Sequence, residues 1–269
     1  MHILAVVNQK GGVGKTTTAV NLAGALAAAE RPTLLVDLDP QGNATAGVWP
    51  DPARLSGPTI YEVLLEGIPA EQACRGTALP ALTLLPSGGD LVGAELELVG
   101  IVNREARLRG ALASFTDRFR FVIVDCPPSL GLLTLNALVA ANAAVIPLQC
   151  EYYALEGLAQ LMKTLDLVRD RANPNLGVEG ILFTMFDART SLAVQVRGEV
   201  ERYFQRHLFK TVIPRNVRLT EAPSHGRPIV QYDLRSPGAV AYLELAREVI
   251  AHDEARARSR ARGAAAAAG

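Results

Sequence analysis

The chain has 269 residues, of which 49% are hydrophobic, 20% charged and 5% aromatic, and its formal net charge is zero. This composition supplies apolar material for a core and excludes disorder over most of the chain. The longest apolar stretch, 137–148, contains Asn142 and Pro147 and is shorter than the roughly 20 residues of a membrane-spanning helix. No signal peptide is visible, and three cysteines are too few for a disulfide framework or a zinc site. We therefore expect a reduced, cytoplasmic protein.

The N-terminal quarter follows the order strand, glycine-rich turn, helix, strand. An apolar run without helical spacing predicts a buried strand over Ile3–Asn8, and the glycines follow it in 9–14. An Ala/Leu-rich segment predicts a buried helix from Lys15 to about Ala29, which Pro32 ends. The run Thr33–Asp37 predicts the next strand. This is a βαβ unit, in which the two strands lie parallel.

The same alternation continues along the chain. Further helices are predicted over 59–65, 94–115, 130–141, 154–171, 194–207 and 238–251, and further strands over 82–85, 121–125, 144–148, 178–185 and 211–213. Strands separated by helices indicate an α/β fold with one mostly parallel sheet and helices on both of its faces. We expect a single domain over residues 1–254, followed by a basic Ala/Arg-rich tail, 255–269, that is disordered.

A glycine-rich segment, K-G-G-V-G-K-T-T, lies between the first strand and the first helix. Glycines let backbone N–H groups converge on an anion, and the helix adds the positive end of its dipole. Lys15 would reach the β- and γ-phosphates of a nucleotide, and the Thr16 hydroxyl would coordinate Mg²⁺. Gln9 occupies the first glycine position of the usual pattern, so the strict motif fails. The expected phosphate-binding residues are Lys10, Gly11, Gly12, Val13, Gly14, Lys15, Thr16 and Thr17. For Thr17, helix capping is an alternative.

Lys10 is the unusual member of this segment, since the chain has only four lysines and two of them lie here. A second cation beside a cationic loop is repelled unless an anion is present. One interpretation is a solvated surface lysine. The other is a group that neutralises charge developing during phosphoryl transfer.

Together with V-D-L-D-P-Q-G-N at 36–43 and V-D-C-P-P-S at 124–129, this segment resembles the ParA/Soj family of chromosome- and plasmid-partition ATPases. The family lies within the deviant Walker A group. The similarity continues at 150–157 and 211–226 and so extends from Met1 to about Ala251. The resemblance implies a single P-loop NTPase domain that binds ATP or ADP with Mg²⁺ and hydrolyses ATP slowly.

The resemblance also assigns roles to individual side chains. Lys10 matches the lysine that reaches the nucleotide of the partner subunit in an ATP-bound homodimer. Asp39 matches the aspartate that positions the attacking water, although the sequence alone does not choose between Asp37 and Asp39. Asp125 follows four apolar strand residues and matches the Walker B aspartate, which holds Mg²⁺ together with Thr16. Lys10, Lys15 and Asp39 are thus the expected catalytic residues.

Two further sets of residues follow from the resemblance. Pro214 and Asn216 match positions that contact adenine, with a role in a turn as the alternative. Arg189 and Arg218 match arginines that bind DNA. They belong to a segment, 188–218, with seven basic and two acidic residues in an otherwise neutral chain. Such an excess suits contact with phosphates rather than with bases, and a solvated helix face is the alternative.

The implied function is an ATP-driven switch for DNA segregation in the cytoplasm, associated with the nucleoid. The ATP dimer would bind double-stranded DNA nonspecifically, and a ParB/Spo0J-type partner would stimulate hydrolysis and release. A MinD-like, membrane-associated positioning ATPase is the alternative, but it requires a C-terminal amphipathic helix with bulky apolar residues, which the tail lacks. An electron carrier like the nitrogenase iron protein would need a second suitably placed cysteine. A nucleotide-binding scaffold without important hydrolysis is a third alternative.

Overall fold

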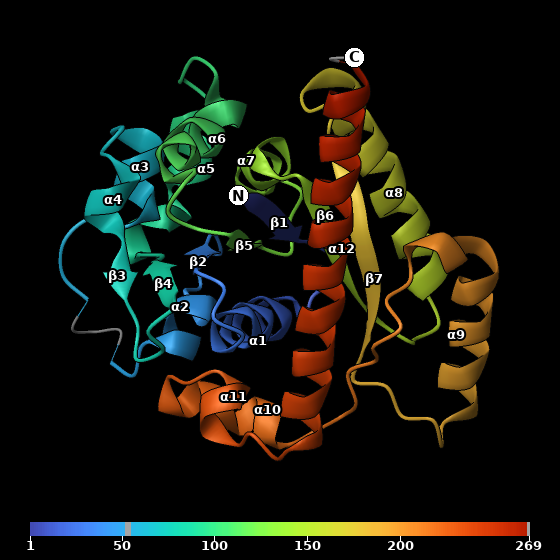
Figure 1. Cartoon of the computed structure of the whole chain (residues 1–269). Coiled ribbons are helices and arrows are strands. Elements are labelled where there is room, and N and C mark those ends of the chain that lie inside the picture. Colours follow the sequence, from blue (N-terminus) through green and yellow to red (C-terminus); the bar gives the residue numbers. More distant parts are fainter. Residues whose placement is uncertain (52–54, 268–269) are drawn as a thin grey trace.

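A computed structural model describes residues 1–51 and 55–267 and contains one seven-stranded sheet (Figure 1). The order of its strands is β3-β4-β2-β5-β1-β6-β7, and every pair is parallel except β3 with β4. The strands are β1 (His2–Val6), β2 (Thr33–Asp37), β3 (Arg75–Gly76), β4 (Leu82–Leu85), β5 (Phe121–Asp125), β6 (Ala143–Gln149) and β7 (Gly177–Thr184). Strands β1, β2 and β5 are buried along their whole length, as continuous apolar runs in a parallel sheet predict.

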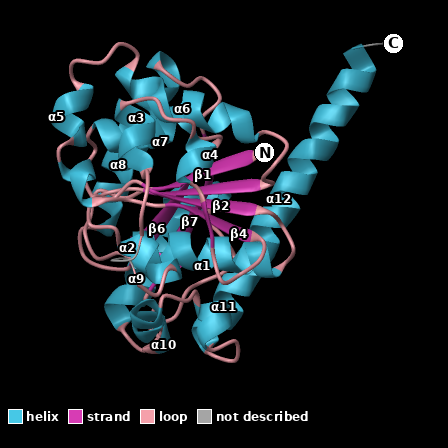
Figure 2. Cartoon of the chain, turned by 90° about the vertical axis from the view of Figure 1, so that its left-hand side faces the viewer, coloured by secondary structure: helices cyan, strands magenta, loops and turns pink. Residues whose placement is uncertain are grey.

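Helices cover both faces of the sheet (Figures 1 and 2). The α-helices are α1 (Lys15–Ala28), α2 (Asn43–Val48), α3 (Ile60–Leu65), α4 (Ala70–Ala73), α5 (Ala94–Leu98), α6 (Arg107–Leu112), α7 (Leu132–Ala140), α8 (Ala154–Arg171), α9 (Ser191–Phe204), α10 (Arg218–Glu221), α11 (Ile229–Tyr232) and α12 (Pro237–Ala267). Short 3₁₀ helices are η2 (Gly89–Val92), η3 (Arg104–Ala106), η4 (Ala113–Phe115), η5 (Gln205–His207) and η6 (Ala222–His225). Within the described ranges, no helix combines the length and apolarity needed to span a bilayer.

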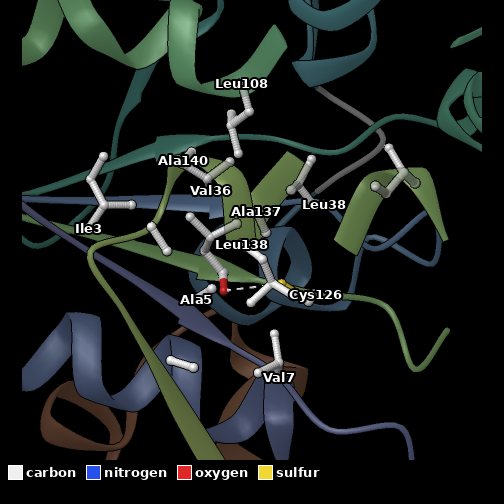
Figure 3. Packing of buried hydrophobic residues seen from close by; sticks show 14 of the residues in the cluster. Ile3, Ala5, Val7, Val36, Leu38, Leu108, Cys126, Ala137, Leu138 and Ala140 are labelled. Atoms are coloured by element: carbon white, nitrogen blue, oxygen red, sulfur yellow. Dashed lines mark hydrogen bonds between the residues drawn. The ribbon is translucent and has the colours of Figure 1, made fainter. Parts of the chain in front are cut away.

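The alternating side chains of the strands build two cores, one on each face of the sheet. On one face, Ile3, Ala5 and Val7 pack with residues of α6 and α7 (Figure 3). On the other face, Leu4 and Val6 pack with α1 and α12. Cys126 lies in the first core with no exposed surface, and its thiol donates to the Val124 carbonyl at 3.8 Å. The structure therefore gives this cysteine a packing role.

The carboxyl ends of β1, β2 and β5 meet at one edge of the sheet. In the strand registers, Asp125 is paired with Asp37 of β2 on one side and with Val6 of β1 on the other. The loop after β1 leads directly into α1. This is the edge at which open parallel sheets bind ligands.

Two predicted elements differ from the structure. The segment 94–115 is not one helix: it divides into α5, η3, α6 and η4, and Asn103, in the turn before η3, has a φ of 55°. Residues 211–213 form no strand. They run beside β7 through a hydrogen bond from the Ile213 amide to the Phe183 carbonyl, and Pro214 forms an isolated parallel bridge with Phe186, but these contacts do not extend into a strand ladder.

The tail also differs from its prediction. We expected 255–269 to be disordered, but α12 continues through residue 255 to Ala267, and residues 268–269 lie outside the described part of the chain. Alanine and arginine are both strong helix formers, so the low complexity of this segment does not prevent a helix. The boundary at residue 254 therefore falls inside a continuous helix.

Candidate nucleotide-binding site

The loop between β1 and α1 presents backbone N–H groups to an open space. Gly12 and Gly14 have φ values of 75° and 85°, which residues with a side chain rarely adopt. Gly14 precedes α1 as its N-cap, and no side chain caps this helix end. A Cβ atom on Gly11 or Gly12 would meet no atom within 4 Å. The positive φ at Gly12, rather than crowding, thus explains the glycine there, and the free N–H groups suit an anion.

Lys15, the first residue of α1, is only 7% exposed. Its ammonium donates to the Lys10 carbonyl at 2.9 Å and so spans the loop. Burial lowers the pKa of Lys15, and the carboxyl groups of Asp125 and Asp39 oppose that shift. The ammonium therefore lies between the loop and two acidic groups, where a phosphate would complete its coordination.

Asp125 is buried without a partner at the end of β5. Among the described residues, no donor forms a hydrogen bond with either of its carboxylate oxygens. Burial, reinforced by nearby Asp37, raises the pKa of Asp125 well above its ordinary value. The Thr16 hydroxyl is near enough to oppose this shift, although it does not complete a hydrogen bond. An unpartnered carboxylate beside a hydroxyl is a donor set that fits Mg²⁺.

The structure separates the two aspartates that the sequence left equivalent. Asp37 is fully buried, and its carboxylate accepts hydrogen bonds of 2.7 Å from both the amide and the hydroxyl of Thr45. Burial raises the pKa of Asp37 to about 6. Asp39 instead lines the cavity above the loop and accepts a 2.9 Å hydrogen bond from the Gln41 amide. Asp37 thus orders the turn into α2, and Asp39 remains available to a ligand.

The cavity has a volume of about 780 Å³. Asp39, Pro214 and Asn216 line it, together with six of the predicted phosphate-binding residues: Gly11, Gly12, Gly14, Lys15, Thr16 and Thr17. Val13 does not line the cavity, because its side chain is buried in the protein. Asn216 also shapes its own turn, since its Oδ1 accepts from the Arg218 amide at 2.8 Å. The turn role of Asn216 is therefore present, and the residue also lines the same cavity as the phosphate loop.

Lys10 is not among the residues that line this cavity. Its ammonium forms an ion pair with Glu151, which follows β6, and both side chains are nearly half exposed. The backbone amide of Lys10 donates to Asn8 Oδ1 at 3.0 Å. The loop thus holds the main chain of Lys10 in place, while its side chain pairs with Glu151 and does not line the cavity.

Arg189 and Arg218 lie outside the cavity and are both paired with acids. The Arg189 guanidinium makes two hydrogen bonds with Asp187, at 2.9 and 2.7 Å, and holds the pKa of that carboxyl at about 2. Arg218 pairs with Glu221 at 2.8 Å and with Asp233 at 3.5 Å. Asp187 and Asp233 fall outside the segment 188–218, so the local charge excess counted there is reduced in the folded protein.

Three of the residues that line the cavity were not predicted from the sequence. The Thr184 hydroxyl at the end of β7 donates to the Val13 carbonyl at 2.8 Å and so supports the phosphate loop. Met185 follows it with a φ of 50°. Tyr242 of α12 lines the cavity, and its hydroxyl lies 3.3 Å from the Thr18 hydroxyl. Only the position of Thr184 and Met185, at the end of a predicted strand, could have indicated them.

Comparisons with known proteins show which family this chain resembles. Residues 1–178 match the model of an AAA domain family. The chain is 55% identical to the chromosome partitioning protein ParA of Myxococcus xanthus over 252 residues, covering 94% of this chain and 89% of that one. It is 52% identical to the sporulation initiation inhibitor protein Soj of Bacillus subtilis over 250 residues, covering 93% and 98%.

Solved structures share the fold. A cobyrinic acid a,c-diamide synthase from Mycobacterium smegmatis, with bound ADP and magnesium, is 40% identical with a TM-score of 0.81, covering 94% of this chain and 95% of that one. The septum site-determining protein MinD from Pyrococcus horikoshii, in complex with Mg-ADP, is 25% identical with a TM-score of 0.77, covering 92% and 95%. The sequence motifs, the fold and the identity to curated relatives over nearly the whole chain agree, and the chain belongs to the ParA/Soj family of chromosome-partitioning ATPases.

Proposed function

We propose that this protein is a switch for DNA segregation that forms a homodimer when it binds ATP. The observation that carries the proposal is the position of Lys10, which does not line the cavity of its own chain and whose ammonium pairs with the half-exposed Glu151. A lysine held at the rim can reach a nucleotide in a second copy of the chain. Two such lysines would tie nucleotide binding to dimerisation.

Within each protomer, the residues at the sheet edge have separate tasks. Lys15 and the N–H groups of the glycine loop would bind the phosphates, and Thr16 and Asp125 would hold Mg²⁺. When bound, Mg²⁺ neutralises charge on the phosphate oxygens. Asp39 would orient the attacking water, and Lys10 of the partner would stabilise the charge that develops on the transferred phosphoryl group. Pro214 and Asn216 would contact the adenine base.

The output of the switch would be the binding of double-stranded DNA by the dimer. Arg189 is 90% exposed and Arg218 is half exposed, so phosphates can compete with their present carboxylate partners. Because dimerisation doubles such a surface, DNA binding should depend steeply on salt and on ATP. A ParB/Spo0J-type protein would stimulate hydrolysis and release the dimer, and the protein would act in the cytoplasm at the nucleoid.

The membrane-associated alternative is disfavoured by the C-terminal helix. From residue 255 onward, its only apolar side chains are those of alanine, whereas an interfacial helix needs bulky apolar residues on one face.

The test is the size of the protein in solution with no nucleotide, with ADP and with ATP, each with and without nonspecific duplex DNA. We expect a monomer except in Mg-ATP, where a dimer forms and binds DNA. Lys15→Ala should remain a monomer in every condition, whereas the control Lys163→Ala, exposed on α8, should behave like the wild type. A monomer in saturating Mg-ATP, even when hydrolysis is blocked, would contradict the proposed function.

A further inference from the structure

The C-terminal part of α12 is fixed to the protein by a buried carboxylate. The Glu179 side chain in β7 has no exposed surface, and Arg256 pairs with it at 2.8 Å. His252 Nδ1 lies 3.0 Å from the other Glu179 oxygen, and His2 Nε2 lies 3.1 Å from the first. Burial alone would raise the pKa of Glu179, but hydrogen bonds from His2 and Arg256 lower it to about 2. Glu179 is therefore ionised and holds α12 at this point.

Two ion pairs support the same stretch of helix. Arg120, which precedes β5, pairs with Asp253, and Arg31, which precedes β2, pairs with Glu254 at 3.4 Å. Among the described residues, Arg256 is the last of α12 to bond with another element, since Arg258 pairs only with Glu254 of its own helix, at 4.0 Å. The direction of the remaining helix is thus set by contacts made just before it leaves the protein.

Beyond this point the helix projects freely from the globular part (Figure 2). We call residues 256–267 the arginine arm. At 1.5 Å per residue, the arm extends roughly 16 Å past Arg256. Arginine occurs at every second position from 256 to 262, and the sequence has no acidic residue after Glu254. The arm therefore concentrates positive charge on a helical segment of a chain whose net charge is zero.

The arm presents its charge away from the protein. Residues four apart lie on the same face of a helix, whereas a residue two positions along lies nearly opposite. Arg256 faces Glu179, so Arg258 and Arg262 share the face that is directed outward. The Arg258 side chain is 66% exposed, and Arg262 is also exposed. These two guanidinium groups have no carboxylate of another element to satisfy them within the described chain.

We propose that the arginine arm is a second nucleic-acid-binding surface, which contacts the phosphate backbone through Arg258 and Arg262. Guanidinium groups on one helix face suit phosphates, and their small alanine neighbours allow a close approach. The arm lacks the bulky apolar residues that an anionic membrane surface would require, and this favours a nucleic acid. The inference depends on the proposed function only for the choice of DNA as the polyanion. The arm is present in each protomer, so its contribution does not require the ATP dimer.

The experiment measures binding of a labelled duplex DNA of about 24 base pairs over a series of salt concentrations, with and without Mg-ATP. The full-length wild type is compared with the double variant Arg258→Ala/Arg262→Ala. We expect the slope of log K against log salt to fall by about two, and the affinity at ~0.1 M salt to fall about tenfold or more. The difference in DNA binding between the wild type and the double variant should also be present without nucleotide. The ATPase rate without DNA should not change.

The matched control is Arg247→Ala, because Arg247 is 72% exposed on the same helix but precedes the arm. The salt slope of Arg247→Ala should match that of the wild type, and its DNA affinity should stay within about twofold. An unchanged slope in the double variant would overturn the proposal, and so would an equal loss in Arg247→Ala. Binding of the wild type, but not of the double variant, to phosphatidylglycerol vesicles with unchanged DNA binding would assign the arm to membranes instead. These outcomes are distinct from a failure of the proposed function, in which the wild type would stay a monomer in Mg-ATP.

Discussion

Lys10 of the glycine loop and Glu151, which follows β6, form an ion pair although they are 141 residues apart in the chain. The pair connects the phosphate loop to the segment that follows β6. In the proposed dimer, the Lys10 ammonium must leave Glu151 to reach the nucleotide of the partner. The ion pair therefore opposes dimerisation by an amount that can be measured.

Glu151→Gln should strengthen ATP-dependent dimerisation. An exposed ion pair contributes up to about 1 kcal/mol, and each dimer breaks two of them. A total of ~1 kcal/mol corresponds to about a fivefold lower dissociation constant. The measurement is analytical ultracentrifugation in Mg-ATP, with the exposed Glu156→Gln on α8 as a control. Weaker dimerisation of Glu151→Gln would instead show that Glu151 stabilises the dimer.

Asp39→Asn should nearly abolish ATP hydrolysis while leaving ATP binding intact. The asparagine retains an oxygen that can accept the hydrogen bond from the Gln41 amide, so the turn is preserved and only the carboxylate charge is lost. We expect the rate of phosphate release to fall about 100-fold or more. The dimer should then persist in ATP. Asp39→Ala tests the same group and should also trap the dimer on DNA. Normal hydrolysis in both variants would remove Asp39 from the mechanism.

Arg189 and its carboxylate partner Asp187 allow the proposed DNA surface to be tested by variants that should weaken binding and by one that should strengthen it. Arg189→Ala should weaken DNA binding by the ATP dimer and lower the salt slope by about one. Asp187→Asn should strengthen binding several-fold, because it releases the Arg189 guanidinium from its carboxylate. Arg218→Ala should also weaken binding. Dimerisation in ATP should be unchanged in all three variants, and equal DNA affinity throughout would place the contact surface elsewhere.

Thr184→Val should weaken nucleotide binding although Thr184 has no predicted contact with the nucleotide. Valine has nearly the shape of threonine, but it cannot donate to the Val13 carbonyl. The loss of one hydrogen bond, ~1 kcal/mol, corresponds to about a fivefold weaker affinity if the loop is ordered by that bond. The measurement is titration calorimetry with ADP. Thr164→Val is the control, since its hydroxyl bonds only the Gln160 carbonyl within α8. Equal affinity of wild type and Thr184→Val would show that the loop is ordered without this bond.

The parts of the fold that the sequence predicts are those specified locally. The buried strands and the glycine loop after β1 are encoded by short runs of apolar residues and glycines, and the structure confirms that these elements form. The prediction for 94–115 was wrong because helical spacing continues across it, whereas Asn103 adopts a positive φ that interrupts the helix. For the arginine arm, the prediction of disorder was wrong because it rested on low complexity, although the segment consists of strong helix formers.

The residues of the candidate site also fall into two groups, those that the local sequence predicts and those that only the fold brings together. The loop residues are neighbours in sequence and were predicted together. Tyr242 contributes to the cavity only because α12 packs on α1, and no local sequence pattern predicts that contact. The choice between Asp37 and Asp39 required the position of Thr45, which binds Asp37. Charge counted along the chain also failed to include Asp233, which lies beside Arg218 only in the folded protein.

The buried carboxylate of Glu179 should make a pH-dependent contribution to stability. Its pKa of about 2 in the folded protein is below the ordinary 4.5, so the folded state favours the ionised form. The stabilisation is therefore fully present above pH 4.5 and is lost as the pH falls toward 2. The difference of about 2.5 in pKa corresponds to an upper limit of roughly 3 kcal/mol. Glu179→Gln removes this titration while keeping the side chain's size.

Urea unfolding of the wild type and Glu179→Gln between pH 7 and pH 3.5 measures this contribution. We expect the wild type to be more stable by a constant amount down to about pH 5, with the difference shrinking below pH 4.5. Glu244→Gln is the control, because its exposed ion pair with Arg247 lies on the same helix and contributes at most about 1 kcal/mol. A difference between wild type and Glu179→Gln that stays constant down to pH 3.5 would mean that the carboxylate charge does not hold α12 to the sheet.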